Sequence, residues 1–582
     1  MTFENELNKN DYILNLEIKI GEYTFLRFLP DLNYTPDDKT YVLLSDVSIN
    51  PSTIDVTQVK TTLTSINFTL LDKNGEISSI LGVVENSLLG NEVILKQGFI
   101  NNEFSYNDYK EISRGVLRSV NKVDNNYKFI ARELTSRLSE NIFQKSNELN
   151  EELLENDSII ILKDSSIFPQ SGIVKIDDEF IYYDNNDQVQ TLSTLTRGFL
   201  GSTVSSKHEN DLPVFKVDVI EENPINILLQ MSLSGGNEGS SFDVLNEGLG
   251  LSENIFNMTE IIELRDKSFS SDVYRFELWD LGNALKFFEK EILEATNTRF
   301  INKDGKISIV ELDQIKAGEV FPEINENTII GQPSWDKSAD RIYNEIIINY
   351  NYSASQNKFT RIETLIDQES IDTYLQKRTI SFSFKGIKSD LNGLQIVKTR
   401  AKKLLERLAT PQTRVSVKTF FKNSIYNIGE ILNIVHRNIP QSGGGLGFNS
   451  SMEVLSKGVD YTSATVKFNL QFTSSFNHRF ALIAPSPLIY NILDRKTFDV
   501  PRPECYAVGY VVQIKNEIKT IEKIEGNKIT LASEFSFDLT ENDRLKFTDY
   551  DLTSDAQKAR YIFISPTDQN FPSGEKYYSI IF

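Results

Sequence analysis

Residues 194–215 read TLTRGFLGSTVSSKHENDLPVF and contain one of only three histidines in the chain. The residues before them, 171–190, are rich in hairpin signals, because acidic turn-forming clusters separate β-branched and aromatic runs. Four polar residues of this region could form a reaction centre, a metal site or the frame of a small β-structure, namely Arg197, His208, Glu209 and Asp211.

Metal and catalytic interpretations of this stretch fail on spacing. A zincin helix would need a second histidine at position 212, which is Leu212, and His436 and His478 are far away in the sequence. Cys505 is the only cysteine and has no recognisable partner motif, and the chain has no Gly-x-Ser-x-Gly elbow. No spacing selects a catalytic pair among the 82 acidic residues, although glycosidase chemistry stays open. We therefore predict a protein that is not an enzyme and uses no metal or other cofactor.

Several other segments resemble ligand sites but lack the required residues. DKNGEI (72–77) and NKDGKISIVEL (302–312) echo an EF-hand loop, yet alignment on the glycine puts Leu70 or Phe300 where an aspartate is required, so we predict hairpin turns. SGGNEGSS and QSGGGLGFNS match no phosphate-loop pattern and are predicted to be loops. The basic run KTRAKK (398–403) lies opposite the apolar stripe of a helix, which favours a solvated face over a patch for DNA.

The composition favours a large, mostly β protein. A length of 582 residues suits about three to five domains. Hydrophobic residues make up 40% of the chain, with many Tyr and Phe, a balance typical of folded, strand-rich domains. The net charge of −21 makes the chain as a whole a poor binder of phosphate backbones. No stretch approaches the roughly 18 apolar residues of a membrane span, so we expect no membrane span and a chain that is soluble when made.

Apolar periodicity divides the chain into strand-rich and helical regions. Alternation predicts strands near residues 66–70, 346–352 and 466–472. Near the C-terminus, Gly526-Asn527 can supply the positive φ of a tight turn, which predicts a hairpin there. Spacing at the helical period predicts helices over residues 222–233, 279–296 and 396–410. Residues 145–158 are polar and acidic without alternation, which predicts a connector or a solvated helix.

The region from Gly172 onward resembles a small β-module of phage tail-tip and baseplate proteins. The shared pattern is a glycine-led strand, an acidic residue before an aromatic pair, the triplet TRG, a glycine-threonine turn and a histidine before the final strand. Ser202 is inserted in the turn, and residues 209–211 replace the glycine that often follows the histidine. The pattern is carried here by Gly172, Glu179, Tyr182, Tyr183, Arg197, Gly198, Gly201 and His208.

These residues are best interpreted as a structural frame. Arg197 can pair with Glu179 across strands, and Gly198 and Gly201 permit tight turns. His208 can cap or hydrogen-bond the returning loop. The structural frame is therefore favoured over a ligand site.

Two further segments resemble siphophage-type tail hubs. Residues 222–253 are similar to a segment of those hubs, although Asn246 stands where proline is common, and residues 401–435 resemble their second tube-like barrel. The resemblance covers most of residues 12–480. It implies a trimeric hub in which each chain contributes two similar barrels, so that three chains can mate with a sixfold tail tube.

The patterns and the resemblance together predict a mainly β fold with some α structure (α+β) in five parts. These are a first tube-like β-barrel (1–145), a small β-hairpin module (150–218), a helical connecting domain (219–330), a second tube-like β-barrel (331–482) and a C-terminal, fibre-proximal β domain (490–582).

The resemblance implies a virion structural protein at the tail tip or baseplate, made in the host cytoplasm. It implies a homotrimer that joins the distal tail protein and tape measure protein to a central fibre or spike, and DNA that passes a channel without specific binding during ejection. One alternative is a receptor- or glycan-binding tail protein for host attachment, such as a depolymerase, motivated by the Tyr and Phe content. Another is the hub of a phage-derived injection device or gene transfer agent.

Overall fold

The chain folds into two compact units, one ending at Phe472 and the other made of the described residues beyond it. Asn246, His478 and Cys505 lie outside the described residues. Among the described residues, no helix has both the length and the apolar character needed to cross a membrane. The computed structural model describes residues 13–30, 34–49, 52–57, 59–60, 65–83, 88–100, 104–235, 240–245, 247–312, 321–440, 446–472, 480–483, 488–501, 503, 506, 508–547, 561–564 and 578–581.

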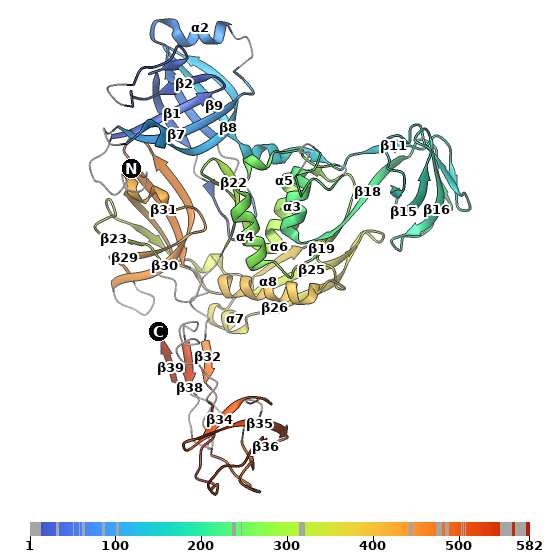
Figure 1. The fold of residues 1–582 in the computed structure, drawn as a ribbon, viewed down its shortest axis with the longest axis vertical. Coiled ribbons are helices and arrows are strands. Elements are labelled where there is room, and N and C mark those ends of the chain that lie inside the picture. The colour runs from blue at the N-terminus through green and yellow to red at the C-terminus, as the bar shows by residue number, and fades with distance from the viewer. Residues whose placement is uncertain are drawn as a thin grey trace. The chain divides into compact units, whose positions relative to one another are not determined.

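The first unit begins with an eight-stranded sheet that curls into a half-barrel (Figure 1). Its order is β3-β2-β1-β7-β8-β9-β6-β4, and all pairs except β2–β3 are antiparallel. The predicted alternation in β6 is confirmed, because Ile66, Phe68 and Leu70 are buried. The strands are β1 (Ile13–Ile20), β2 (Tyr23–Leu26), β3 (Thr40–Tyr41), β4 (Leu44–Ile49), β6 (Ser65–Leu71), β7 (Glu92–Ile100), β8 (Lys110–Val123) and β9 (Asn126–Glu133).

The segment DKNGEI starts a helix, so its interpretation as a hairpin turn is wrong. Helix α2 (Glu76–Val83) follows a short 3-10 turn. The Asp72 carboxylate accepts hydrogen bonds from the backbone N–H groups of Ile77 and Ser78, at 3.0 and 3.1 Å. Asp72 thereby satisfies helix donors that have no partner inside the first turn.

The small β-module is a seven-stranded sheet with an apolar core of its own (Figure 1). The connector or helix predicted for residues 145–158 is wrong, because this segment supplies β11 and β12 and buries Leu149 and Leu153. β12 (Leu153–Leu154) pairs with β17 (Lys207–His208). The sheet order is β11-β18-β14-β15-β16-β13, with β19 also on β18: β11 (Ser146–Glu148), β13 (Ile159–Ile161), β14 (Gly172–Ile176), β15 (Glu179–Asn186), β16 (Thr191–Phe199), β18 (Pro213–Glu222) and β19 (Tyr274–Leu278).

Helices follow the module. The helix predicted from residue 222 is confirmed as α3 (Pro224–Leu233), and the Asn223 side chain caps it by accepting from the Ile225 N–H at 2.9 Å. α4 (Met258–Ser268) comes next. The helix predicted over residues 279–296 begins only at Ala284, because Asp280 and Gly282 have φ values of 40° and 65° and Asn283 caps the helix instead.

That last helix contains an unusual turn. It runs as α5 (Ala284–Phe287), a π-helical turn (Phe288–Leu293) and α6 (Glu294–Thr296). Single π-helical turns inside α-helices occur frequently at functional sites. Ahead of it, β20 (Gly282–Asn283) pairs with β10 (Asn141–Ile142).

A hairpin of β21 (Thr298–Lys303) and β22 (Lys306–Glu311) follows the helices. The hairpin turn predicted for residues 302–312 is confirmed, and its central residues Asp304 and Gly305 have φ values of 51° and 74°. Such values match the type I′ turn that the right-handed twist of two-stranded ribbons favours. The hairpin contacts both large sheets: Asn302 Nδ2 lies 3.4 Å from Ser113 Oγ of β8, and Val310 lies against Gly429, next to β29.

The second large sheet contains the other predicted strands. The alternation over residues 466–472 is confirmed in β31. Within QSGGGLGFNS, residues 446–450 belong to β30 and not to a loop, while residues 441–445 lie outside the described residues. The order is β23-β29-β30-β31-β28-β24, with β5 (Ser52–Thr53) also on β30: β23 (Glu323–Asn325), β24 (Ser334–Asp336), β28 (Arg414–Phe420), β29 (Ile431–Pro440), β30 (Leu446–Asp460) and β31 (Thr465–Phe472).

A three-stranded sheet and a long helix complete the first unit. β25 (Glu345–Ser353) pairs with β26 (Lys358–Ile366) and β27 (Thr379–Ser383), and α7 (Gln368–Tyr374) connects the latter two. The predicted strand near 346–352 is confirmed in β25, and the third predicted helix in α8 (Gly393–Leu408). α8 packs on β25 and β26 (Figure 1).

The named elements of the second unit, β32 to β39, are all strands, and the unit has a separate apolar core. The predicted hairpin at Gly526 is confirmed between β35 and β36, with φ of 55° at this glycine. The predicted fold class, a mainly β multidomain chain with helices, is therefore confirmed. The strands are β32 (Phe480–Ile483), β38 (Tyr561–Ile564) and β39 (Tyr578–Ile581) in one sheet, and β33 (Thr497–Asp499), β34 (Val511–Ile514), β35 (Glu517–Glu525), β36 (Lys528–Leu531) and β37 (Lys546–Phe547) in another.

Gly429→Ala tests the contact between the β21–β22 hairpin and the second large sheet. Gly429 has φ of 83°, and an added Cβ would lie 2.5 Å from Val310 Cγ2. We expect a loss of about 3 kcal/mol from backbone strain and overpacking together. Gly331→Ala, also at positive φ but in open space, is the control and should cost only about 1 kcal/mol. The urea midpoint of the first unit measures both, and equal losses would contradict the contact.

Candidate functional site

The residues of the predicted β-module converge on the Glu179 carboxylate. Arg197 donates to it from Nε and Nη2 at 2.7 and 2.8 Å, a bidentate pair. The backbone N–H groups of Gly198 and Ser205 donate at 3.1 and 2.9 Å. Although burial opposes ionisation, the hydrogen bonds from Arg197, His208 and the backbone lower the pKa of Glu179 to about 2.

His208 connects this carboxylate to a second one. Its Nε2 lies 2.9 Å from Glu179 Oε2, and its Nδ1 lies 2.9 Å from Asp177 Oδ2. Burial works against a charged ring, yet these two carboxylates raise the pKa of His208 above its usual value. A doubly protonated His208 ring donates to both carboxylates. The hydrogen-bonding groups of this ion network are therefore used for contacts within the module.

The remaining predicted residues shape the strands around the network. Tyr183 is buried and donates to the Pro169 carbonyl at 3.0 Å, and an added Cβ at Gly172 would lie 3.0 Å from the Tyr183 hydroxyl. Gly198 has φ of 65°, and Gly201 has φ of 73° in open space. The Tyr182 ring lies 5.5 Å from the ring of Phe199 on β16.

Glu179→Ala should destabilise the module strongly. It removes five hydrogen bonds to one buried carboxylate and leaves Arg197 and His208 without it. We expect a loss of about 3–5 kcal/mol, as for other buried charge pairs broken on one side. Hydrogen exchange of the β15 and β16 amides measures it. The control is Glu209→Ala, because the Glu209 side chain is 72% exposed. Equal protection of the β15 and β16 amides in the two variants would contradict the role of the network.

The two large sheets are joined directly at β5 and β30. Thr53 pairs with Ser456 in antiparallel register, and the Ile54 N–H donates to the Leu455 carbonyl at 2.8 Å. Arg27 also reaches across and donates to the Tyr461 carbonyl at 3.2 Å. A segment that lies between β4 and β6 of the first sheet in sequence thereby adds a strand to the second.

Three buried arginines lie close to this joint. Arg299 donates to the Asp55 carbonyl at 2.9 Å, and Arg407 pairs with Glu453 on β30. Arg400 is only 5% exposed, so the interpretation of KTRAKK as a wholly solvated face is wrong at this position. Burial and the neighbouring arginines lower the pKa of Arg400 to about 9 and that of Arg299 to about 10. The basic run therefore contributes to the interior as well as to the surface.

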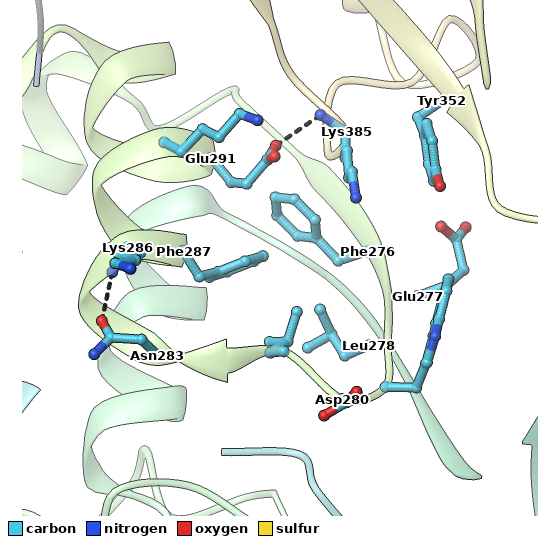
Figure 2. A pocket seen from close by; sticks show the side chains of 13 residues that line it. Phe276, Glu277, Leu278, Asp280, Asn283, Lys286, Phe287, Glu291, Tyr352 and Lys385 are labelled. Carbon is cyan, nitrogen blue, oxygen red and sulfur yellow. Dashed lines mark hydrogen bonds between the residues drawn. The ribbon is translucent and has the colours of Figure 1, made fainter. Parts of the chain in front are cut away.

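A pocket of about 360 Å³ opens between β19, the π-helical turn and the sheet of β25 (Figure 2). Figure 2 shows Phe276, Leu278 and Phe287 directed into it, with Glu291 and Lys385 near one end and Asp280 near the other. Sequence reasoning missed this pocket, because its residues come from separate segments and carry no common motif.

Glu291 is the most deeply buried charged residue of the pocket, 4% exposed. Its Oε2 accepts a hydrogen bond from the Lys385 backbone N–H at 2.7 Å. Burial raises the pKa of Glu291 to about 7. Burial likewise raises the pKa of Glu133 on β9 to about 7.

The stability of the first unit should therefore fall as pH rises from about 5 to 7.5. The folded state holds protons on Glu133 and Glu291 in this range, whereas the unfolded chain has already released them, so each group weakens folding by up to about 3 kcal/mol. Urea unfolding of the wild-type chain at several pH values measures the slope. Glu291→Gln should reduce it, and Glu263→Gln, an exposed carboxylate on α4, should not. A flat wild-type profile would contradict the buried carboxyl groups.

No group of three or more His, Cys, Asp or Glu side chains is arranged to hold a metal ion in the part of the chain that the structure describes. His436 is buried on β29, and its Nδ1 lies 3.1 Å from the Asn438 backbone N, which donates to it.

Among the comparisons with known proteins, only the one with solved structures finds proteins that are similar to this chain. No protein-family model and no curated protein matches the chain. A tail protein from Neisseria meningitidis MC58 is 10% identical with a TM-score of 0.36, over 79% of this chain and 97% of that one. The 43 kDa tail protein of prophage MuSo2 from Shewanella oneidensis is 8% identical with a TM-score of 0.35, over 79% and 98%. Prophage tail protein gp18 from Listeria monocytogenes EGD-e is 10% identical with a TM-score of 0.32, over 79% and 94%. At these values, function has to be argued from the residues of this chain.

Proposed function

We propose that the chain is a structural protein of a phage-type tail, acting as a baseplate or tail-tip hub and not as an enzyme. The observation that carries this proposal is the joint at β5 and β30, which holds two large curled sheets of one chain together. Three such chains would present six sheet surfaces, which is the number that a sixfold tail tube requires, while keeping threefold symmetry below.

The residues of the small β-module support the same proposal. Their pattern resembles that of tail-tip proteins, and Glu179, Arg197 and His208 bond to one another within a buried ion network. The proposed partners are a distal tail protein and a tape measure protein on the tube side, and a central fibre or spike on the other. The proposed location is the tail tip of a virion or of a related injection device or gene transfer agent particle.

The acidic balance of the chain suits a passage for DNA. With a net charge of −21, a channel through the proposed trimer would be lined by acidic or neutral side chains, which repel the phosphate backbone and let DNA slide. A channel lined with Lys and Arg would contradict this part of the proposal.

Electron microscopy of the purified full-length protein tests the hub. We expect class averages of a threefold ring with a central channel and a mass of three 66.4 kDa chains by light scattering. Ile54→Pro removes the N–H that donates to Leu455 at the joint, and it should abolish the ring while the far-ultraviolet circular dichroism stays close to that of the wild type. A chain that stays monomeric at all concentrations and binds host polysaccharide would favour the receptor-binding alternative.

A further inference from the structure

The rim of the pocket beside β19 is rich in positive charge, although the chain carries −21 overall. Lys286, Lys290 and Lys385 all contribute to its lining, and all three are exposed. Lys286 and Lys290 lie one turn apart on the helix that contains the π-helical turn, whereas Lys385 follows β27. Three ammonium groups around one opening attract an anionic group of a ligand.

Most of the acidic groups of the lining do not cancel this charge. Glu277 is already paired with Lys388, whose Nζ lies 2.9 Å from Oε2. Glu291 is buried, and its pKa of about 7 leaves it largely protonated in slightly acidic solution. Asp280 is exposed and offers carboxylate oxygens, which accept hydrogen bonds from hydroxyl groups.

The floor of the pocket is apolar and largely aromatic. Figure 2 shows the rings of Phe276 and Phe287 and the side chain of Leu278 directed into the space. Trp279 also lines it, and the Phe180 ring of the β-module lies edge-on to the Trp279 ring at 5.3 Å. Flat, rigid surfaces of this kind suit a ring-shaped ligand that has apolar faces.

We propose that this pocket binds an acidic sugar, a monosaccharide unit that carries a carboxylate or phosphate group. The lysines hold the anionic group, Asp280 accepts from the ring hydroxyls, and the aromatic floor contacts the C–H faces of the ring. A bare inorganic anion leaves the floor unused, and a neutral sugar leaves the lysines unused. The volume of about 360 Å³ lies in the range of small-molecule sites. This site goes beyond a structural role in a tail and does not depend on it.

Tryptophan fluorescence provides a direct test, because the chain has only two tryptophans. In the full-length Trp335→Phe variant, Trp279 of the pocket is the sole reporter. We expect a saturable change with glucuronate and with glucose 6-phosphate, at least tenfold weaker binding of glucose, and no change with inorganic phosphate. Equal affinity for glucose and glucuronate, an equal response to inorganic phosphate, or no saturable change with any probe would overturn the proposal.

Charge variants in the same background localise the site. Lys286→Gln and Lys290→Gln should each weaken glucuronate binding about tenfold, while Lys306→Gln, which changes an exposed lysine at the start of β22, should leave it unchanged. Circular dichroism and the urea midpoint of each variant establish that it is folded. Folded Lys286→Gln and Lys290→Gln proteins that bind as tightly as the Lys306→Gln control would overturn the proposed site.

A comparison of a polysaccharide fragment with a free sugar acid distinguishes two sources of the ligand. A hyaluronan tetrasaccharide presents glucuronate units within a chain. Tighter binding of the tetrasaccharide than of free glucuronate would support the site and indicate a surface polysaccharide. Binding of free glucuronate alone would also support the site and indicate a free sugar acid. Weakening of both interactions in Lys286→Gln, by about the same tenfold factor, ties either result to this pocket. Ring formation in electron microscopy remains a separate readout of the hub.

Discussion

One continuous apolar core holds the two large sheets and the helices of the first unit together. It extends from Leu16 and Phe68 in the first large sheet, through Phe288 in the helical region, to Leu432 and Phe468 in the second large sheet. Burial of this apolar surface is the main favourable term in folding, and close packing inside it makes the sheets and helices mechanically one body. Hydrophobic burial already stabilises the contact between the two large sheets. The directional hydrogen bonds between β5 and β30 therefore add a defined register to that contact.

Buried charges give this core a defined arrangement. Arg407 of α8 is 3% exposed and pairs with Glu453 of β30, which is fully buried. Removing two charges from water is expensive, and only a well-formed pair offsets that cost. A sliding of α8 along the sheet would separate the pair and leave two uncompensated charges in the interior. The apolar contacts tolerate small shifts, whereas this ion pair does not, and so it fixes the register of the helix.

Local patterns in the sequence predicted the parts of the fold that depend on local contacts. Each of these patterns involves residues only a few positions apart, and each is present in the structure. They are the alternation in β6, β25 and β31, the helical stripe of α8 and the turn at Gly526. In the module, a resemblance carried by a single stretch of sequence pointed to Glu179, Arg197 and Gly198, and the fold brings these three residues into contact.

Features that depend on contacts between distant residues were not predicted from the sequence. Leu153 looked like part of a polar connector, since its strand partner, His208, lies on a separate segment. Arg400 lies in a basic run that reads as solvated, and only the packing of α8 buries it. Asp72 is a local exception, because it looked like the start of a hairpin turn, yet its side chain caps a helix by accepting from the N–H groups of Ile77 and Ser78. The pocket is the extreme case, because Phe276 and Lys385 are brought together by the fold alone.

The β-module takes part in that pocket although it has a core of its own. Its Phe180 is fully buried and contacts Trp279, the residue directly after β19, and β19 itself pairs with β18 of the module. Lys175 on β14 adds a cation above the same tryptophan ring, 5.5 Å from its centre. The Glu179 network fixes the start of β15, where Phe180 lies. The module thus acts as a rigid support for one wall of the pocket, because a shift of β15 would move Phe180 and with it the ring of Trp279.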